Sequence, residues 1–207
     1  MQFLFDRTGF PLIRVPEVGL DVQLLPVTKV QFERFIAEPN GFGDTWYEEI
    51  LGVNPRVSYR QFTADNREGI FITGLLPEEA VSFARWMGDG FTLLTIEEWR
   101  TIYKALEHRP VESGELEKLR SQCSAEQPLV ILEQLREQLE PRSWLSLSLM
   151  YGGLVEWVRG ENSWAGLGVP RYEFYPNLWD PLADVVSPLH PDERLPYFGI
   201  RLVRKVE

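Results

Sequence analysis

One stretch constrains the fold of this chain more than any other. Gly152 and Gly153 precede the apolar residues 154–158, a run that is interrupted by the single carboxylate of Glu156. Paired glycines allow backbone conformations and close approaches that a Cβ atom would block, and the run is typical of a strand buried on both faces. Because an isolated buried carboxylate is costly, Glu156 must be paired or hydrogen-bonded. The stretch is therefore either the nucleus of the fold or the floor of a ligand site.

Length and composition predict one globular domain. The chain has 207 residues, of which 44% are hydrophobic and 13% aromatic, with seven tryptophans among them. A chain of this size and apolar content can bury a substantial core. We therefore expect a single domain over residues 1–207.

The charge balance argues against two classes of partner. The formal net charge is -10, whereas sequence-independent nucleic-acid binding and docking on anionic membranes both require a basic surface. Cys123 is the single cysteine, so neither an intramolecular disulfide nor a thiolate metal cluster is expected. The N-terminus has no signal-peptide pattern, and no apolar run has the length of a membrane helix. The expected location is the cytoplasm.

The N-terminal part of the chain predicts short strands followed by a helix. A turn at residues 6–9 separates two apolar segments, as in a hairpin, and residues 12–15 and 22–25 are further strand candidates. Thr28 followed by Gln31 has the pattern of a capping box. A helix is therefore expected to begin there.

The next part of the chain predicts a loop, a short strand and two more helices. Residues 42–69 are rich in aromatic and turn residues and predict a loop, and residues 70–74 predict a brief strand. A helix is expected to begin at Pro77, because proline is favoured in a first turn. Thr95 and Glu98 repeat the capping-box pattern and predict the start of a third helix.

Residues 108–141 differ in character from the rest. Aromatic residues are absent, and leucines recur at helical spacing among charged residues. We expect two helices joined near Gln127 and Pro128, which form a helical insertion at about residues 110–141. The insertion either packs on the domain or offers a surface to a partner helix. The leucines are Leu116, Leu119, Leu129, Leu132, Leu135 and Leu139.

The C-terminal part of the chain predicts two strands around a long loop. The strands are expected at residues 152–158 and 198–203, and the irregular aromatic segment lies at residues 161–196. A long loop without regular structure is usually functional or tightly pinned. The whole pattern predicts an α+β fold with short strands, several helices and much irregular loop.

Four stretches, in order, resemble motifs of the formylglycine-generating-enzyme (sulfatase-modifying factor) family. Residues 26–35, PVTKVQFERF, are similar to "PVTNAQYxxF", and residues 80–99, with FARW and LTIEEW, to "AxxFCxWxGxRLPTEAEWE". Residues 152–158, GGLVEWV, are similar to "GNVWEWV", and residues 198–203, FGIRLV, to "GFRLV". Since the order matches over nearly the whole chain, the resemblance implies that family's variant of the C-type lectin-like fold.

The chain departs from the family at its catalytic positions. Residues 171–174, RYEF, resemble part of "RGGSW…RCAFR", and Tyr172 stands where the family has a catalytic cysteine. A phenol does not replace a thiolate in binding a soft metal. His108 and His190 are too few for the three-histidine iron site of the related sulfoxide synthases, and Gly153 replaces an asparagine that lies beside a calcium site in the family. The resemblance therefore implies a bacterial member with no catalytic residues, no bound metal and no cofactor.

The resemblance also implies a binding surface. In non-catalytic members, such as the variable proteins of diversity-generating retroelements, the C-terminal loop displays the ligand-contacting residues. The corresponding residues here are Trp164, Arg171, Tyr172, Tyr175, Asn177, Trp179 and Asp180. The alternative is that several of these rings only pin the loop to the core, Trp164 first among them. A second alternative concerns Asp180, Asp184, Asp192 and Glu193, which are either a hard-cation site or a solvated loop.

The sequence thus predicts a pseudoenzyme, a non-catalytic module that binds a ligand or protein, or serves as a scaffold, through its aromatic C-terminal loop. A protein partner is expected, with no nucleic acid and no membrane. Two other hypotheses remain open. One is a divergent metal-dependent oxidase on the same fold, and the other is a structural assembly subunit that uses the leucine-rich insertion.

Overall fold

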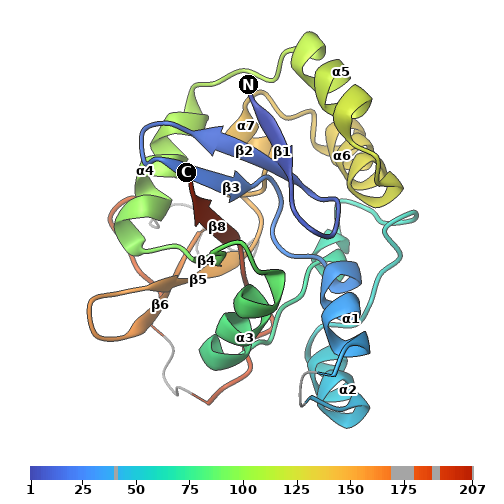
Figure 1. Cartoon of the computed structure of the whole chain (residues 1–207), viewed down its shortest axis with the longest axis vertical. Coiled ribbons are helices and arrows are strands. Elements are labelled where there is room, and N and C mark those ends of the chain that lie inside the picture. Colours follow the sequence, from blue (N-terminus) through green and yellow to red (C-terminus); the bar gives the residue numbers. More distant parts are fainter. Residues whose placement is uncertain (40–41, 169–179, 188–191, 207) are drawn as a thin grey trace.

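The computed structural model describes residues 1–39, 42–168, 180–187 and 192–206. It is a mixed α+β structure in which helices surround two β-sheets (Figure 1). Within these ranges, no helix has both the length and the apolar character needed to cross a membrane. The predicted α+β class is therefore confirmed at this level.

The larger sheet joins the two ends of the chain. Its strands are antiparallel in the order β1-β2-β3-β8-β4, so that C-terminal β8 lies between β3 and β4 (Figure 1). The predicted hairpin is confirmed, with Gly9 of its turn at a φ of +83°, where glycine avoids the Cβ clash. The strands are β1 Phe3–Phe5, β2 Pro11–Val15, β3 Leu20–Gln23, β4 Thr92–Leu93 and β8 Leu202–Lys205.

The smaller sheet contains the glycine-rich stretch. Its order is β6-β5-β7, with β5 Val155–Arg159 antiparallel to β6 Trp164–Leu167 and parallel to β7 Phe198–Gly199. The prediction of one strand at residues 198–203 was wrong, since β7 and β8 belong to different sheets. The break falls at Ile200 and Arg201, where Arg201 turns into the core to meet charged and carbonyl partners.

Both predicted capping boxes are present. The Thr28 hydroxyl accepts from the Gln31 N–H at 3.3 Å at the start of α1 Lys29–Ala37. The Thr95 hydroxyl accepts from the Glu98 N–H at 3.2 Å at the start of α4 Ile96–Glu107. As predicted, the helix α3 Pro77–Met87 begins at a proline.

Three predictions about loops and strands were wrong. Residues 42–69 contain the helix α2 Asp44–Val53 and part of the 3-10 helix η1 Arg67–Ile70, because Trp46 of α2 packs on Phe32 of α1 across 5.6 Å between ring centroids. Residues 70–74 form only an isolated bridge between Phe71 and Thr28. The segment at residues 161–196 is not wholly irregular, since it includes β6.

The leucine-rich segment forms two helices, as predicted, but they meet earlier than expected. The helices are α5 Ser113–Gln122 and α6 Glu126–Leu139, so Pro128 lies in the first turn of α6, where its missing N–H costs little. Leu119, Leu132 and Leu135 belong to the same buried cluster as residues of β1, β2 and the short helix α7 Trp144–Leu147. The inward face of the segment is therefore part of the core.

The carboxylate of Glu156 is at the centre of a buried network. Glu156 and Arg201 are each 1% exposed, and Arg201 Nη2 donates to Glu156 Oε1 at 2.7 Å. Trp99 Nε1 of α4 donates to Glu156 Oε2 at 2.9 Å. Arg201 also donates to the carbonyl oxygens of Gln23, Leu24 and Ser148 at 2.7–2.8 Å. The network joins both sheets and α4, so Glu156 belongs to the fold nucleus and not to a ligand floor.

The two glycines before β5 are required by the backbone. Gly152 has a φ of +68°, and a Cβ at Gly153 would lie 2.2 Å from the carbonyl oxygen of Leu149. No side chain fits at Gly153 without movement of the main chain. The glycine at this position therefore has a direct steric cause in this fold.

Lys29 is a second buried charge, and its partners are neutral. Lys29 is 1% exposed, and its Nζ donates to the carbonyl oxygens of Gly69 at 2.8 Å and Pro55 at 3.4 Å. Burial lowers the pKa of the amine from 10.5 to about 7, while nearby Glu33 raises the pKa and Arg56 lowers it further. Burial disfavours the protonated form, and neutral carbonyls compensate only in part.

The lowered pKa of Lys29 predicts that the free energy of unfolding depends on pH. Above pH 7 the unfolded chain still binds the proton that the folded chain has lost, so the free energy of unfolding rises with pH in the window between the two pKa values. Between pH 7 and about pH 9 we expect Lys29 to contribute a gain of up to roughly 2.5 kcal/mol. Urea unfolding of the wild type and of Lys29→Met across this window measures the difference. Parallel pH profiles for the two proteins would contradict the assignment.

Candidate functional site

The structure describes two of the predicted binding residues. Arg171, Tyr172, Tyr175, Asn177 and Trp179 lie outside the described residues, so their roles remain predictions.

Trp164 and Asp180 are described and differ in setting. Trp164 is the first residue of β6, half-buried and opposite Arg159 of β5, and it packs against the core cluster that includes Trp157 and Phe198. Asp180 is exposed. Trp164 therefore has both a core contact and a place beside the turn of the β5–β6 hairpin.

The acidic residues after the aromatic segment form a local turn. The N–H of Asp180 donates to Asp184 Oδ2 at 2.7 Å, and the N–H of Leu182 donates to Asp180 Oδ1 at 2.9 Å. Such bonds are typical of aspartates that shape a loop. No three His, Cys, Asp or Glu side chains converge as metal ligands within the part of the chain that the structure describes.

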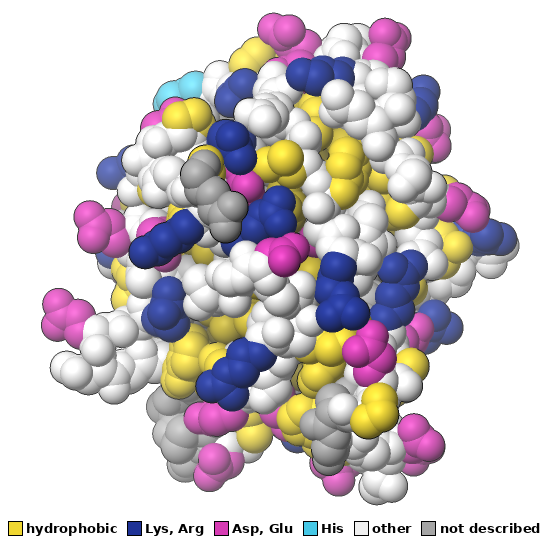
Figure 2. Space-filling view, viewed as in Figure 1, with side chains coloured by type: hydrophobic (Ala, Val, Ile, Leu, Met, Phe, Trp, Pro, Cys, Tyr) yellow, Lys and Arg dark blue, Asp and Glu magenta, His cyan; other side chains and the backbone are white. Residues whose placement is uncertain are grey.

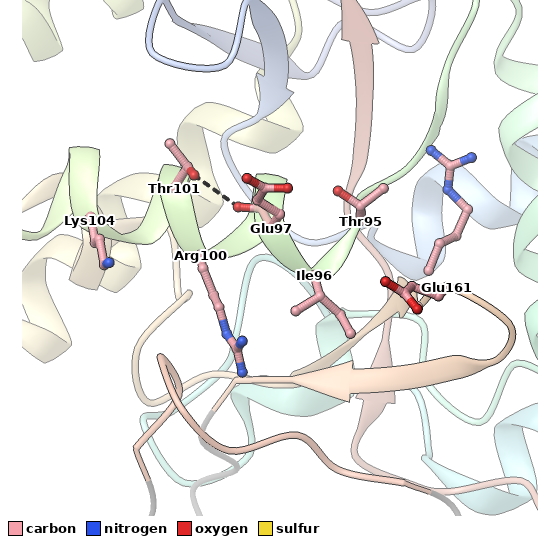
Figure 3. Close-up of a pocket in the computed structure, with 9 residues that line it drawn as sticks. Thr95, Ile96, Glu97, Arg100, Thr101, Lys104 and Glu161 are labelled. Atoms are coloured by element: carbon pink, nitrogen blue, oxygen red, sulfur yellow. Dashed lines mark hydrogen bonds between the residues drawn. The ribbon is translucent and has the colours of Figure 1, made fainter.

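A groove lies between α4 and the turn of the β5–β6 hairpin. Its volume is about 660 Å³. Figure 3 shows Ile96 and Arg100 pointing from α4 toward the hairpin, with Glu161 on the hairpin side and Lys104 further along the helix. The lining residues are Thr95, Ile96, Glu97, Arg100, Thr101, Lys104, Arg159, Gly160 and Glu161.

The two walls of the groove are fixed to each other by main-chain contacts. The N–H of Arg159 donates to the carbonyl oxygen of Leu94 at 2.8 Å, and Thr95 forms a parallel bridge with Arg159. The start of α4 is thus attached to the end of β5. Glu97, Arg100 and Lys104 follow at helical spacing, which places them on one face of α4.

Carbonyl groups hold the two arginines of the groove. Arg100 Nη2 donates to the carbonyl oxygen of Ala183 at 3.0 Å and that of Asp184 at 3.4 Å. Arg159 Nε donates to the carbonyl oxygen of Leu93 at 3.1 Å. Each guanidinium is therefore oriented by neutral acceptors, and apart from these carbonyls its donors have no partner among the residues that the structure describes.

The cations of the groove differ from those on the face of the larger sheet. Figure 2 shows Lys and Arg side chains gathered over the middle of that face, with most Asp and Glu side chains nearer its rim. Within the larger sheet, Arg14 of β2 and Arg204 of β8 both pair with Asp21 of β3. By contrast, none of Arg100, Lys104 and Arg159 forms an ion pair within the described ranges.

Another arginine, Arg194, attaches the chain just before β7 to α3. Arg194 donates two hydrogen bonds of 2.7 Å to the carboxylate of Glu79 on α3, and Trp46 Nε1 donates to the same carboxylate. Burial alone would raise the pKa of Glu79, but the bonds from Arg194, the N–H of Leu76 and Trp46 hold it below its usual value. The C-terminal part of the chain is thus attached to α4 through Arg100 and to α3 through Arg194.

The single cysteine and the two histidines are the other residues of types that often carry reactions. Cys123 is 8% exposed, and burial raises the pKa of its thiol, which favours the unreactive protonated form. His108 is the exposed C-terminal cap of α4, and His190 lies outside the described ranges.

The groove itself was not predicted. The capping-box pattern predicted the start of α4, but nothing in the sequence marked Arg100 and Lys104 as site residues. Their proximity to the hairpin turn depends on the packing of β5 against α4, and no local sequence pattern indicates that packing. In comparisons with known proteins, neither a family model nor a curated protein matches this chain.

Proposed function

We propose that this protein is a non-catalytic protein-binding module with the C-type lectin-like fold of the formylglycine-generating-enzyme family. The four motif-like stretches support the family assignment, because each coincides with an element of the core. They lie at the start of α1, along α3 and into α4, in β5, and across β7 and β8. The mixed α+β architecture is consistent with that fold.

The observation that carries the binding function is the groove of about 660 Å³ beside the β5–β6 hairpin. Trp164, the first of the predicted binding residues, pairs across this hairpin with Arg159 of the groove. The groove combines apolar Ile96 with charged side chains of both signs, a composition that suits a polar segment of another protein. One of the predicted binding residues, Trp164, therefore adjoins the groove.

Site-specific photo-cross-linking in the native host tests this function. A photoreactive amino acid at the exposed position Glu97 on the groove face of α4 is expected to form a specific adduct with a partner protein. Mass spectrometry of the adduct identifies the partner. The free side chain of Glu97 makes no hydrogen bond within the described ranges, so its replacement should leave the fold intact.

The matched control is Glu117, an exposed glutamate on α5. An adduct from position Glu97 alone supports binding at the groove. An adduct from position Glu117 alone would reject the groove and would favour the hypothesis of an assembly subunit that uses the leucine-rich segment. The absence of adducts from both positions would also reject a protein-binding role for this face.

A further inference from the structure

We propose that the groove recognises a segment of its partner that carries carboxylate side chains. This inference rests on the proposed function and adds the chemistry of the partner. The first observation is a contrast of charge. Arg100, Lys104 and Arg159 line one groove, whereas the chain as a whole has a net charge of -10. An acidic protein that gathers cations without ion-pair partners among its described residues in one hollow has an electrostatic preference for anionic groups there.

The position of Arg100 is energetically expensive without a ligand. Its Nε is shielded from solvent and has no hydrogen-bond partner in the part of the chain that the structure describes. One nitrogen, Nη2, contacts the two carbonyl oxygens of Ala183 and Asp184. A guanidinium that has lost part of its hydration and has no carboxylate partner gains most from an anion placed nearby.

Arg159 and Lys104 extend the same preference along the groove. Arg159 is oriented through Nε by the carbonyl oxygen of Leu93, which leaves its Nη donors without partners among the described residues. Lys104 is exposed and makes no hydrogen bond within the same ranges. Two oriented guanidinium groups and one free ammonium match several carboxylates spaced along a peptide better than a single anion.

The groove favours carboxylates over phosphate. Glu97 and Glu161 also line it, so the summed formal charge of its ionic side chains is only slightly positive. A phosphorylated side chain concentrates about -1.5 to -2 charges in one group, whereas the three cations of the groove belong to separate positions of α4 and β5. A segment with separate single charges can place one carboxylate beside each cation.

Titration with short capped peptides, followed by two-dimensional NMR of the full chain, tests the proposal. The probe is a peptide with two glutamates around a leucine, and its counterparts carry glutamine or phosphoserine in place of glutamate. We expect the glutamate peptide to give saturable shifts at residues 96–104 and 159–161. The glutamine peptide should bind roughly tenfold more weakly.

Variants that change the charge of the groove test whether it attracts the glutamate peptide through its cations. Lys104→Glu should weaken binding of the glutamate peptide about tenfold, and Glu97→Lys should strengthen it about threefold. Neither side chain has a hydrogen bond within the described ranges, so both variants should fold. Lys118→Gln, an exposed lysine on α5, is the matched control and should leave the affinity unchanged.

Several results would overturn the inference. These are no saturable shift with the glutamate peptide, shifts outside the groove, equal binding of the glutamine peptide, or tighter binding of the phosphoserine peptide. If any of them occurs while the cross-link from position Glu97 persists, the carboxylate preference is wrong and the proposed function stands. If the cross-link also fails, the proposed function is wrong as well.

Discussion

Replacement of Arg201 with methionine is expected to lower the free energy of unfolding by about 3–5 kcal/mol. The change leaves the carboxylate of Glu156, itself 1% exposed, without its cation. It also removes the donors to the carbonyl oxygens of Gln23, Leu24 and Ser148. Loss of one member of a buried ion pair is costly because the other charge remains desolvated. Urea unfolding followed by tryptophan fluorescence measures the change.

Two further variants separate the charge effect from the loss of packing. Arg85→Met, at an exposed position of α3, should change the free energy of unfolding by less than about 0.5 kcal/mol. The double variant Glu156→Leu with Arg201→Met removes both charges, so it should be more stable than Arg201→Met alone. A loss below about 1 kcal/mol for Arg201→Met would contradict the role of the network in the fold.

The second large effect is expected in the leucine-rich segment. Leu135 of α6 is fully buried, at 0% exposure, so Leu135→Ala should cost about 2–5 kcal/mol through lost apolar burial and the cavity left behind. Leu139 lies one turn further along α6, is only partly buried, and provides a control with the same chemical change. Chemical unfolding of both variants gives the comparison. Similar losses for Leu135→Ala and Leu139→Ala would contradict the packing described here.

The same packing decides how an assembly role of this segment must be tested. Deletion of residues 110–141 would remove Ile131 and Leu135 from the core, together with Glu115, which accepts a hydrogen bond of 2.9 Å from Trp144 Nε1. Such a chain is expected to unfold, and its oligomeric state would then say nothing about assembly. Substitutions at exposed positions of α5 and α6, such as Glu117, are the informative variants.

Local patterns in the sequence predicted the elements whose causes are local. The capping boxes at Thr28 and Thr95 each need only two nearby side chains, and both are present. The requirement that Glu156 be paired was also correct, because the cost of burying a carboxylate does not depend on the fold. Its partner Arg201 is 45 residues away, and nothing local identifies it.

The elements that sequence reasoning missed depend on tertiary contacts. Helix α2 has no side-chain hydrogen bond at its N-terminal cap, and it is held by aromatic contacts such as that between Trp46 and Phe32. Strand β6 contains Gly166, at which a Cβ would lie 2.3 Å from Val155 Cγ1, and glycine lowers the strand propensity of the segment. The groove follows the same rule, since α4 and the hairpin turn are distant in sequence.

The place of β8 has a consequence for synthesis of the protein. Since β8 lies between β3 and β4, the larger sheet closes only after residues 202–205 have left the ribosome. Until then, β3 exposes an unpaired edge, and Gln23 and Leu24 lack the arginine that their carbonyl groups bind in the finished fold. The nascent chain is therefore incompletely folded until then, and its exposed β3 edge is prone to pair with other strands. Its final closure is a long-range step, and such steps are slow.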